Sequence, residues 1–327
     1  MAVLVIVIII AIAFVIRFYE KSTNAICQSQ KKLDGRVAIV TGGTCGMGLE
    51  IAKEFARRGA KVIIACPFNE EGINARKEII ELTGNNDIVF KLMDLSSIDS
   101  VKKFAAGILK SEDRLDILVN NAGVGVPNDF TTADGMSFIM QVNYFGHFLL
   151  SLLLLPLLMK TGKSSDPARI VNTSSVMHHF GMVDMDTLNK TDYWIKSLIY
   201  SKSKICLVLF AHEFTKRLKG YNVVINSVDP GAVGTGIFNS AGKLRGMLLK
   251  FLCLYLYKTP YEGAQTAIHV ALDQEAGSVS GHFFKNCKKT RAVFWAYNNK
   301  VARQLFEESV RLVKLNQEDV DNCFKSL

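Results

Sequence analysis

The sequence predicts an α/β fold in which a doubly wound, parallel sheet carries helices on both faces. Three observations support this prediction: short apolar runs alternate with segments of helical spacing, a glycine-rich turn follows the first run, and glycine (24 residues) far outnumbers proline (6 residues). Regular alternation of strand and helix is typical of a parallel sheet that is buried on both sides.

The elements follow one another from residue 35 without a repeat or a low-complexity tract. Short apolar runs predict strands over 37–40, 61–65, 88–92, 115–119, 169–172 and 223–228. Helical spacing predicts helices over 49–58, 70–82, 98–110, 135–159 and 193–219. The first helix is followed by Gly59, and the long fourth helix contains Pro156 near its end.

The composition is that of a globular chain that can build one large domain. The 327 residues are 49% hydrophobic and 21% charged, and the formal net charge is +9. The charge is dispersed, and the densest basic group is Lys285, Lys288, Lys289 and Arg291. A solvated basic surface is the simplest interpretation, lipid headgroups are the second, and nucleic acid is not expected as a partner.

The cysteines predict neither a disulfide framework nor a metal centre. There are 7 of them, an odd number, and no pair has the spacing of metal ligands. We therefore expect free thiols in a domain that faces a reducing compartment.

The N-terminus predicts a membrane anchor. Residues 1–16 are apolar without a break, which corresponds to roughly 24 Å of helix against a bilayer core of about 30 Å, and Phe18 and Tyr19 could extend it. A cleaved signal peptide is the alternative, but no positive side chain precedes the run and no small-residue cleavage site ends it. We predict an anchor over 1–19, a linker over 20–34 and a folded domain over 35–327.

The basic residues near the anchor predict its orientation. Arg17, Lys21, Lys31 and Lys32 all follow the apolar run. Because positive residues stay on the cytoplasmic side of a membrane, the folded domain is expected in the cytosol.

A glycine-rich loop follows the first predicted strand and opens the first helix. It has the sequence TGGTCGMG, and its candidate cofactor contacts are Gly42, Thr44, Gly46, Met47 and Gly48. Glycines let a backbone turn sharply and approach a pyrophosphate, and the helix N-terminus offers free N–H groups and a positive dipole end. The loop predicts a Rossmann-type dinucleotide site, with an ordinary tight turn as the alternative.

Two later strands also end in polar residues. Asp94 follows the third strand, where an adenine contact and a cap for the next helix are equally supported. Asn121, Ala122 and Gly123 follow the fourth strand, and their small side chains would let a cofactor ring lie close.

A tyrosine and a lysine four residues apart form the catalytic hypothesis. Tyr200 and Lys204 share one face of a predicted helix, and a nearby ammonium is expected to lower the pKa of a phenol, which is ordinarily about 10. Tyr200 could then exchange a proton with an alcohol or carbonyl oxygen. Ser175 could hydrogen-bond the same oxygen, and Asn143 could hold a water that relays the proton to Lys204. Taken singly, the Tyr200–Lys204 pair could be an ordinary surface pair, Ser175 a turn cap and Asn143 a satisfied buried amide.

Together these motifs resemble the short-chain dehydrogenase/reductase superfamily. The resemblance rests on TGGTCGMG, NNAG, Asn143, Ser175 and the Tyr200–Lys204 pair. It implies a single Rossmann-type domain with strand order 3-2-1-4-5-6-7 and a nicotinamide cofactor. It further implies cofactor contacts from Tyr200, Lys204, and a motif made of Pro230, Gly231 and Thr235.

A closer resemblance is to the branch of that superfamily that contains retinol dehydrogenases 11 to 14. Segments 142–148, 169–179, 258–266 and 280–284 are similar to that branch, which also has an N-terminal anchor. The branch carries an insertion comparable to the 25 residues that separate Ser175 from Tyr200. In the family pattern the second serine of such a pair is catalytic, so the resemblance implies that Ser175, and not Ser174, has this role.

Three positions depart from the resemblance. The branch usually places an arginine for the 2′-phosphate of NADP where this chain has Pro67, and NAD-preferring relatives place an aspartate where it has Cys66. Arg57, Arg58 or Arg76 could replace the missing arginine. The resemblance therefore favours NADP(H) and leaves NAD(H) open. The third departure is Asp229, where relatives commonly carry histidine.

The segment 236–258 is expected to cover the substrate cleft. Its part 244–257 is rich in Leu, Phe and Tyr, which predicts a lipophilic substrate and contact with the membrane interface, or else a core helix. The leading hypothesis is an NADP(H)-dependent alcohol dehydrogenase or carbonyl reductase for a retinoid or long-chain aldehyde at the endoplasmic reticulum membrane. The alternatives are a steroid substrate, a mitochondrial membrane and a nucleotide-binding scaffold without turnover. A homodimer is a further hypothesis.

Overall fold

The centre of the molecule is an eight-stranded sheet in the order β3-β2-β1-β4-β5-β6-β7-β8, parallel except for its last strand. The computed structural model describes residues 14–15, 17–19, 21–125, 129–191, 196–233 and 257–325. The strands are β1 (Val37–Thr41), β2 (Lys61–Cys66), β3 (Ile88–Leu92), β4 (Ile117–Asn120), β5 (Ala168–Thr173), β6 (Val223–Asp229), β7 (Phe283–Lys285) and β8 (Lys288–Thr290). The predicted order of the first seven strands is confirmed, and β8 is an addition.

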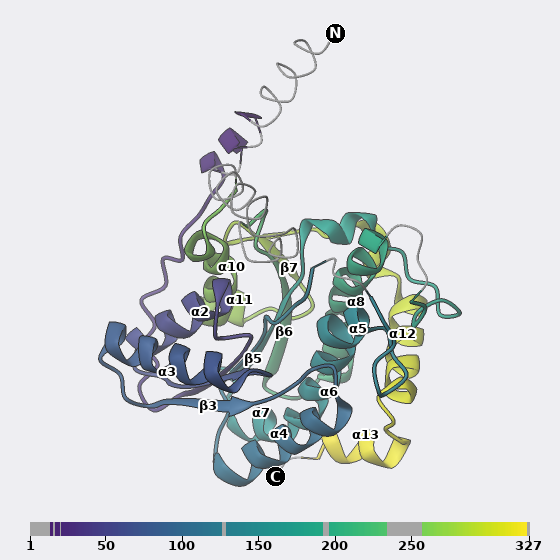
Figure 1. The fold of residues 1–327 in the computed structure, drawn as a ribbon, viewed down its shortest axis with the longest axis horizontal. Helices are drawn as coiled ribbons and strands as arrows, with labels where there is room; N and C mark the ends of the chain where they lie inside the picture. Colours follow the sequence, from purple (N-terminus) through teal and green to yellow (C-terminus); the bar gives the residue numbers. More distant parts are fainter. Residues whose placement is uncertain are drawn as a thin grey trace.

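Helices cover both faces of this sheet. Figure 1 shows α2, α3 and α10 on one side and α4, α5, α6, α8 and α12 on the other. The helices are α2 (Gly46–Arg57), α3 (Asn69–Thr83), α4 (Ile98–Ser111), α5 (Phe138–Met140), α6 (Gly146–Leu153), α7 (Leu155–Thr161), α8 (Lys196–Arg217), α10 (Pro260–Leu272), α11 (Gln274–Gly277), α12 (Asn299–Leu312) and α13 (Gln317–Cys323). Strands β1, β4 and β5 are buried along their whole length, as expected for a covered parallel sheet.

The helix predicted over 135–159 is broken twice, so that prediction was wrong in its continuity. A turn of π-helix, η1 (Gln141–Phe145), separates α5 from α6, and the helical stretch Phe138–Leu153 is bent by 52° from α7. Pro156 lies in the first turn of α7, where its missing N–H costs no hydrogen bond. The π-turn, in contrast, carries Asn143, one of the predicted site residues.

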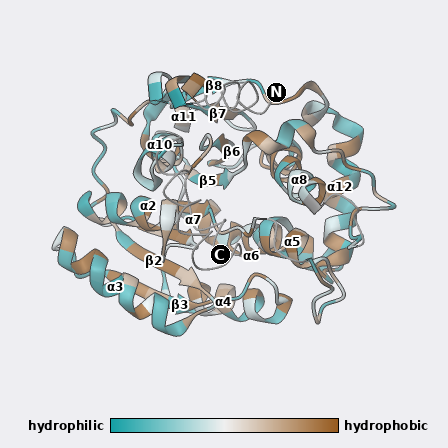
Figure 2. Cartoon of the chain, turned by 45° about the horizontal axis from the view of Figure 1, so that its top comes forward, coloured by the Kyte–Doolittle hydropathy of each residue, from teal (hydrophilic) through white to brown (hydrophobic). Residues whose placement is uncertain are grey.

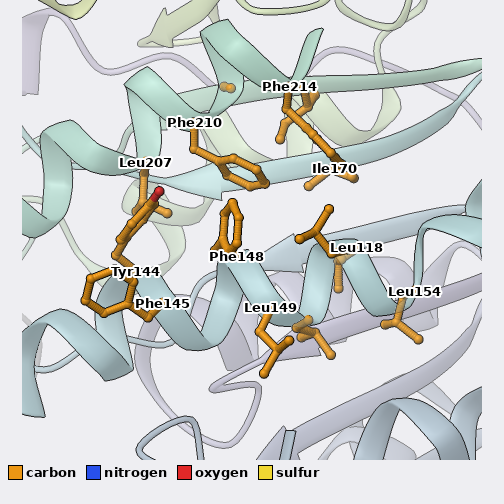
Figure 3. Close-up of a cluster of buried hydrophobic side chains, with 14 of the residues drawn as sticks. Leu118, Tyr144, Phe145, Phe148, Leu149, Leu154, Ile170, Leu207, Phe210 and Phe214 are labelled. Carbon is orange, nitrogen blue, oxygen red and sulfur yellow. The ribbon is translucent and has the colours of Figure 1, made fainter. Parts of the chain in front are cut away.

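Aromatic side chains pack α6 against α8. Figure 3 shows Phe148, Phe210 and Phe214 in this core. The rings of Phe148 and Phe210 meet edge to face with centroids 5.1 Å apart, and those of Phe210 and Phe214 stack with centroids 4.9 Å apart. Burial of such rings contributes apolar area and specific ring geometry to the core. The packing fixes the spacing between η1 and α8, and therefore between Asn143 and Tyr200.

The outer helices are amphipathic. Figure 2 shows hydrophobic and hydrophilic residues alternating around α3 and α4 at one edge of the sheet. In α4, Val101, Phe104 and Ile108 are buried, while Lys103 is exposed and pairs with Asp99. This pattern is the reason that the helical spacing was visible in the sequence.

The segment predicted as a linker docks on the domain. Lys21 Nζ lies 2.6 Å from a carboxylate oxygen of Glu262, at the start of α10. Further along, the backbone N–H of Cys27 donates to Gln265 (3.1 Å), and the hydroxyl of Ser29 donates to the carbonyl of Leu272 (3.1 Å). Residues 21–29 therefore follow α10 from its first turn to its last.

The predicted anchor lies almost entirely outside the described residues. Within the described part of the chain, no single helix is long and apolar enough to cross a membrane. One bent pair, Phe138–Leu153 with Leu155–Thr161, meets the length and composition criteria, and its residues Phe148, Leu150 and Leu157 are fully buried in the domain core.

Candidate active site

The glycine-rich loop turns tightly between β1 and α2. Gly42 has a φ of +63°, Gly46 a φ of +55°, and the N–H of Gly42 donates to Ala65 at the end of β2 (2.8 Å). A Cβ on Gly48 would lie 2.1 Å from the Gly42 carbonyl oxygen, so no larger residue fits there. The loop thus has the close backbone approach that a pyrophosphate needs, at the N-terminus of α2.

Thr41 joins this loop to the end of β4. Its hydroxyl oxygen accepts hydrogen bonds from the N–H groups of Asn121 (2.9 Å) and Ala122 (3.0 Å), and the Asn121 amide donates to the Thr41 carbonyl (3.0 Å). The two strands are neighbours at the point where the strand order reverses, which is where doubly wound sheets bind nucleotides. Oδ1 of Asn121 is buried without a protein partner. The tight backbone of the glycine-rich loop and the unpartnered Oδ1 of Asn121 both fit a bound dinucleotide.

Asp94 closes a local turn. Its Oδ1 accepts hydrogen bonds from the N–H (2.8 Å) and the hydroxyl (2.7 Å) of Ser96. The N-cap of α4 itself is Ser97. The alternative that Asp94 caps this helix was therefore wrong, because its Oδ1 closes a local turn with Ser96, and the side chain lies at the carboxyl end of β3, where an adenine contact is expected.

Tyr200, Lys204 and Ser175 form one cluster at the carboxyl end of β5. Lys204 Nζ lies 5.5 Å from the centroid of the Tyr200 ring and donates to the Thr173 carbonyl at 3.0 Å. The Ser175 hydroxyl hydrogen-bonds the Tyr200 phenol. The neighbouring Ser174 donates instead to the Lys204 carbonyl (2.9 Å), so the two serines have different partners.

The pKa values in this cluster differ from the sequence-based expectation. Burial lowers the pKa of Lys204 to about 8. The pKa of Tyr200 is raised, mainly by burial and further by the charge of Asp229, while the hydrogen bond from Ser175 acts in the opposite direction. The lowering expected from Lys204 does not outweigh the effect of burial, so the net shift of the Tyr200 pKa is upward.

Asn143 ties the loop after β4 to η1 and α8. Its Oδ1 accepts from the N–H of Val124 (2.8 Å), and its Nδ2 donates to the Val124 carbonyl and to Ser203 Oγ, both at 3.0 Å. A Cβ on Gly123 would lie 3.4 Å from both Asn143 Oδ1 and Lys204 Nζ. Asn143 is thus a satisfied buried amide, and it also borders the cluster that contains Lys204.

His147 is a site residue that sequence reasoning missed. Its Nε2 lies 2.9 Å from the Thr41 hydroxyl and its Nδ1 lies 3.2 Å from the Asn143 carbonyl oxygen. Complete burial lowers its pKa to about 3, so the ring is neutral at physiological pH. It lies one helical turn after Asn143, a spacing that could have drawn attention to it.

The end of β6 completes the described part of the site. Asp229 Oδ1 accepts from the N–H of Gly231 (3.0 Å), and its Oδ2 lies 3.5 Å from Lys285 Nζ on β7. Gly231 has a φ of +82°, which explains a glycine after Pro230. Thr235 lies outside the described residues. Among the residues that the structure describes, no cluster of His, Cys, Asp and Glu could hold a metal ion.

These features are those of a Rossmann-type oxidoreductase, because a tight glycine-rich loop and a cluster of tyrosine, lysine and serine lie at the same, carboxyl edge of the parallel sheet. The chain belongs to the short chain dehydrogenase family, whose sequence profile matches residues 36–245.

The chain is similar to several mammalian retinol dehydrogenases. It is 41% identical to retinol dehydrogenase 12 of Bos taurus over 90% of this chain and 92% of the relative. It is 39% identical to retinol dehydrogenase 11 of Homo sapiens over 90% of each chain. It is 38% identical to human retinol dehydrogenase 13 over 91% and 90% of the two chains. The resemblance to this branch is confirmed.

Solved structures share the fold. The Pseudomonas aeruginosa RhlG/NADP active-site complex is 26% identical and superposes with a TM-score of 0.62 over 78% of this chain and 95% of that one. A protein from Mycobacterium Paratuberculosis is 25% identical, with a TM-score of 0.69 over 87% and 96% of the two chains.

Proposed function

We propose that this enzyme interconverts a lipophilic alcohol and its aldehyde or ketone, with a retinoid or a long-chain aldehyde as substrate. The observation that carries the proposal is the cluster of Tyr200, Lys204 and Ser175 beside the dinucleotide loop. The names of the mammalian relatives support a retinol-type substrate.

Tyr200 is proposed as the group that exchanges the proton with the substrate oxygen. The bound nicotinamide supplies the hydride in reduction and accepts it in oxidation. Because the pKa of Tyr200 is raised, the phenol is protonated at neutral pH and can donate to a developing alkoxide. Ser175 holds the same oxygen, and the Lys204 ammonium stabilises the phenolate. Asn143 is proposed to hold a water that extends the proton path from Lys204.

The cofactor contacts are proposals of the same kind. The pyrophosphate is expected at the loop and the adenine near Asp94, and the nicotinamide is expected between Tyr200 and the ends of β4 and β6. The residues proposed for these contacts are Gly42, Thr44, Gly46, Met47, Gly48, Asp94, Asn121, Ala122, Gly123, Tyr200, Lys204, Pro230, Gly231 and Thr235. The resemblance favours NADP(H), and NAD(H) is the alternative because Pro67 stands where the branch places its arginine.

The proposed setting is a membrane surface. An anchor over 1–19 in the endoplasmic reticulum membrane, with the domain in the cytosol, would place the site near a substrate dissolved in the bilayer. The segment 236–258, of which the structure describes only Tyr257 and Lys258, is proposed as the apolar cover of the cleft. A mitochondrial membrane and a homodimer are open alternatives.

The variant Tyr200→Phe tests the proposal in the detergent-solubilised full chain. Reduction of all-trans-retinal, decanal and a ketosteroid is measured with NADH and with NADPH, alongside the surface control Tyr261→Phe. We expect Tyr200→Phe to lower kcat by about 10²–10⁴-fold while cofactor binding, followed by fluorescence, is kept.

Each outcome of this panel has a consequence. Full activity in Tyr200→Phe would refute the proposed proton transfer. Cofactor binding without turnover of any substrate by the wild type would favour the scaffold alternative. Turnover of the ketosteroid alone would favour the steroid alternative.

A further inference from the structure

We infer that this protein selects NAD(H) against NADP(H), and that Glu71 is a residue that sets this preference. The inference rests on the nucleotide site of the proposed function. It concerns the segment that follows β2, which borders the glycine-rich loop.

The end of β2 lies directly beside that loop. Thr41 pairs with Ala65 in the parallel register, and the N–H of Gly42 donates to the Ala65 carbonyl (2.8 Å). Cys66, the next residue, is buried at the carboxyl end of the sheet, and its thiol donates to the Phe68 carbonyl (3.2 Å). In a doubly wound fold the ribose next to the pyrophosphate lies at the end of this strand, and an acidic or basic side chain there chooses the cofactor.

The first turn of α3 carries two acidic residues at the edge of the sheet where the loop lies. That turn contains Glu70 and Glu71. Helix α3 begins at Asn69, three residues after β2 ends, so its first turn lies at the same edge of the sheet as the loop. In keeping with this placement, the charge of Glu71 raises the pKa of the Cys45 thiol in the loop, after a larger effect of desolvation. Acidic residues in a first turn also offset the positive end of the helix dipole. A 2′-phosphate here would meet a like charge rather than an open helix N-terminus.

The arginines that could have replaced a phosphate ligand lie elsewhere, so that expectation was wrong. Arg57, in the last turn of α2, pairs with Glu54 at 3.6 Å. Arg58 donates to the carbonyls of Ser29 (2.8 Å) and Lys31 (3.0 Å).

Arg76 is also directed away from the loop. Its Nε donates to the carbonyl of Ile88 (2.7 Å), the first residue of β3. Because the loop is at the carboxyl edge of a parallel sheet, Arg76, Arg57 and Arg58 are all held at the opposite edge. Pro67, at the position of the usual arginine, offers no side-chain donor.

The same carboxylate would favour NAD(H) positively. A carboxylate accepts a hydrogen bond from a ribose 2′-hydroxyl, which NADP(H) lacks because that oxygen carries its phosphate. Glu71 would therefore act in both directions, by attraction to one cofactor and repulsion of the other.

Binding titrations test this inference without relying on turnover. The full chain in detergent is titrated with NADH and with NADPH, and each Kd is measured from nicotinamide fluorescence and checked by thermal shift. We expect NADH to bind at least about tenfold more tightly, because one charge contact is typically worth that much. Glu71→Gln should reduce the ratio several-fold, and Pro67→Arg combined with Glu71→Gln should invert it. Glu70→Gln, which removes a charge from the same helical turn, should leave the ratio unchanged.

The outcomes separate this inference from the proposed function. Equal or tighter binding of NADPH by the wild type would overturn the NAD(H) preference and leave the proposed function intact. An unchanged ratio in Glu71→Gln, or an equal effect of Glu70→Gln, would overturn the role of Glu71. Binding of neither cofactor would overturn both the inference and the proposed function.

Discussion

The two ends of the expected cofactor site are built differently. At the nicotinamide end, Asn143, Lys204 and His147 are fully or almost fully buried and hydrogen-bonded to partners on other elements. At the ribose end, Pro67 and Glu71 are exposed and lie in the short stretch from the end of β2 to the first turn of α3.

This difference explains why the motifs at the nicotinamide end match the family while the usual arginine at the ribose end is replaced by Pro67. A change at the nicotinamide end would leave buried polar groups without partners, which is costly. A change at the ribose end alters charge at the surface and disturbs little else. Cofactor preference can therefore change by single substitutions while the reacting groups stay in place.

The largest expected effect separates two adjacent serines at the nicotinamide end. Ser175→Ala removes the hydroxyl that bonds Tyr200 and should lower kcat by about 10²-fold, as loss of an oxyanion donor does. Ser174→Ala removes a bond to the Lys204 carbonyl and should cost about 1 kcal/mol of unfolding free energy, with kcat kept within about threefold. Steady-state kinetics and chemical denaturation compare the two variants. Equal losses of kcat would contradict the assignment of Ser175.

The second prediction concerns stability at the nicotinamide end, where His147 is completely buried. Its pKa is about 3 in the folded protein and about 6.5 when unfolded, so between these values the unfolded state binds more protons and stability falls as the pH falls. Its contribution should decrease by about 2 kcal/mol between about pH 7 and pH 5. Denaturation of wild type and His147→Gln measures this, with the partly exposed His212→Gln as control. The same acid sensitivity in wild type and His147→Gln would contradict it.

The third prediction concerns the pH dependence of kcat, which should follow the charge of Lys204 at the nicotinamide end. Since burial lowers its pKa to about 8, the amine loses its positive charge above that pH and no longer stabilises a Tyr200 phenolate. The kcat for carbonyl reduction should be level below pH 8 and fall about tenfold per pH unit above it. A profile measured from pH 6 to 10 tests this, and a level rate up to pH 10 would contradict it.

The smallest expected effect comes from the charges at the end of β6. Asp229 raises the pKa of Tyr200, so Asp229→Asn should move the alkaline midpoint of alcohol oxidation downward by less than about one pH unit. Lys285→Met, which removes the cation 3.5 Å from Asp229, should move the midpoint upward. Shifts in the same direction for both variants would contradict this electrostatic role.

Much of the fold could be predicted because its signals are local. The apolar run of β1, the glycines of the loop and the four-residue spacing of Tyr200 and Lys204 each lie within a few residues of one another. The break of the helix over 135–159 was not predicted, because a π-turn leaves no mark in apolar spacing. Strand β8 was missed because its three residues, Lys288–Thr290, are all charged or polar.

The sequence by itself determined the alternation of strands and helices, the glycine-rich loop and the spacing of Tyr200 and Lys204, because each of these signals is local, and the family resemblance supplied the strand order. Only the tertiary structure decided which groups face one another. Thr41 and Asn121 are 80 residues apart in the chain and Asn143 and Ser203 are 60 apart, yet each pair is hydrogen-bonded. The direction of the Tyr200 pKa shift and the placement of Arg76 away from the loop follow from burial and from strand direction, which no short stretch of sequence encodes.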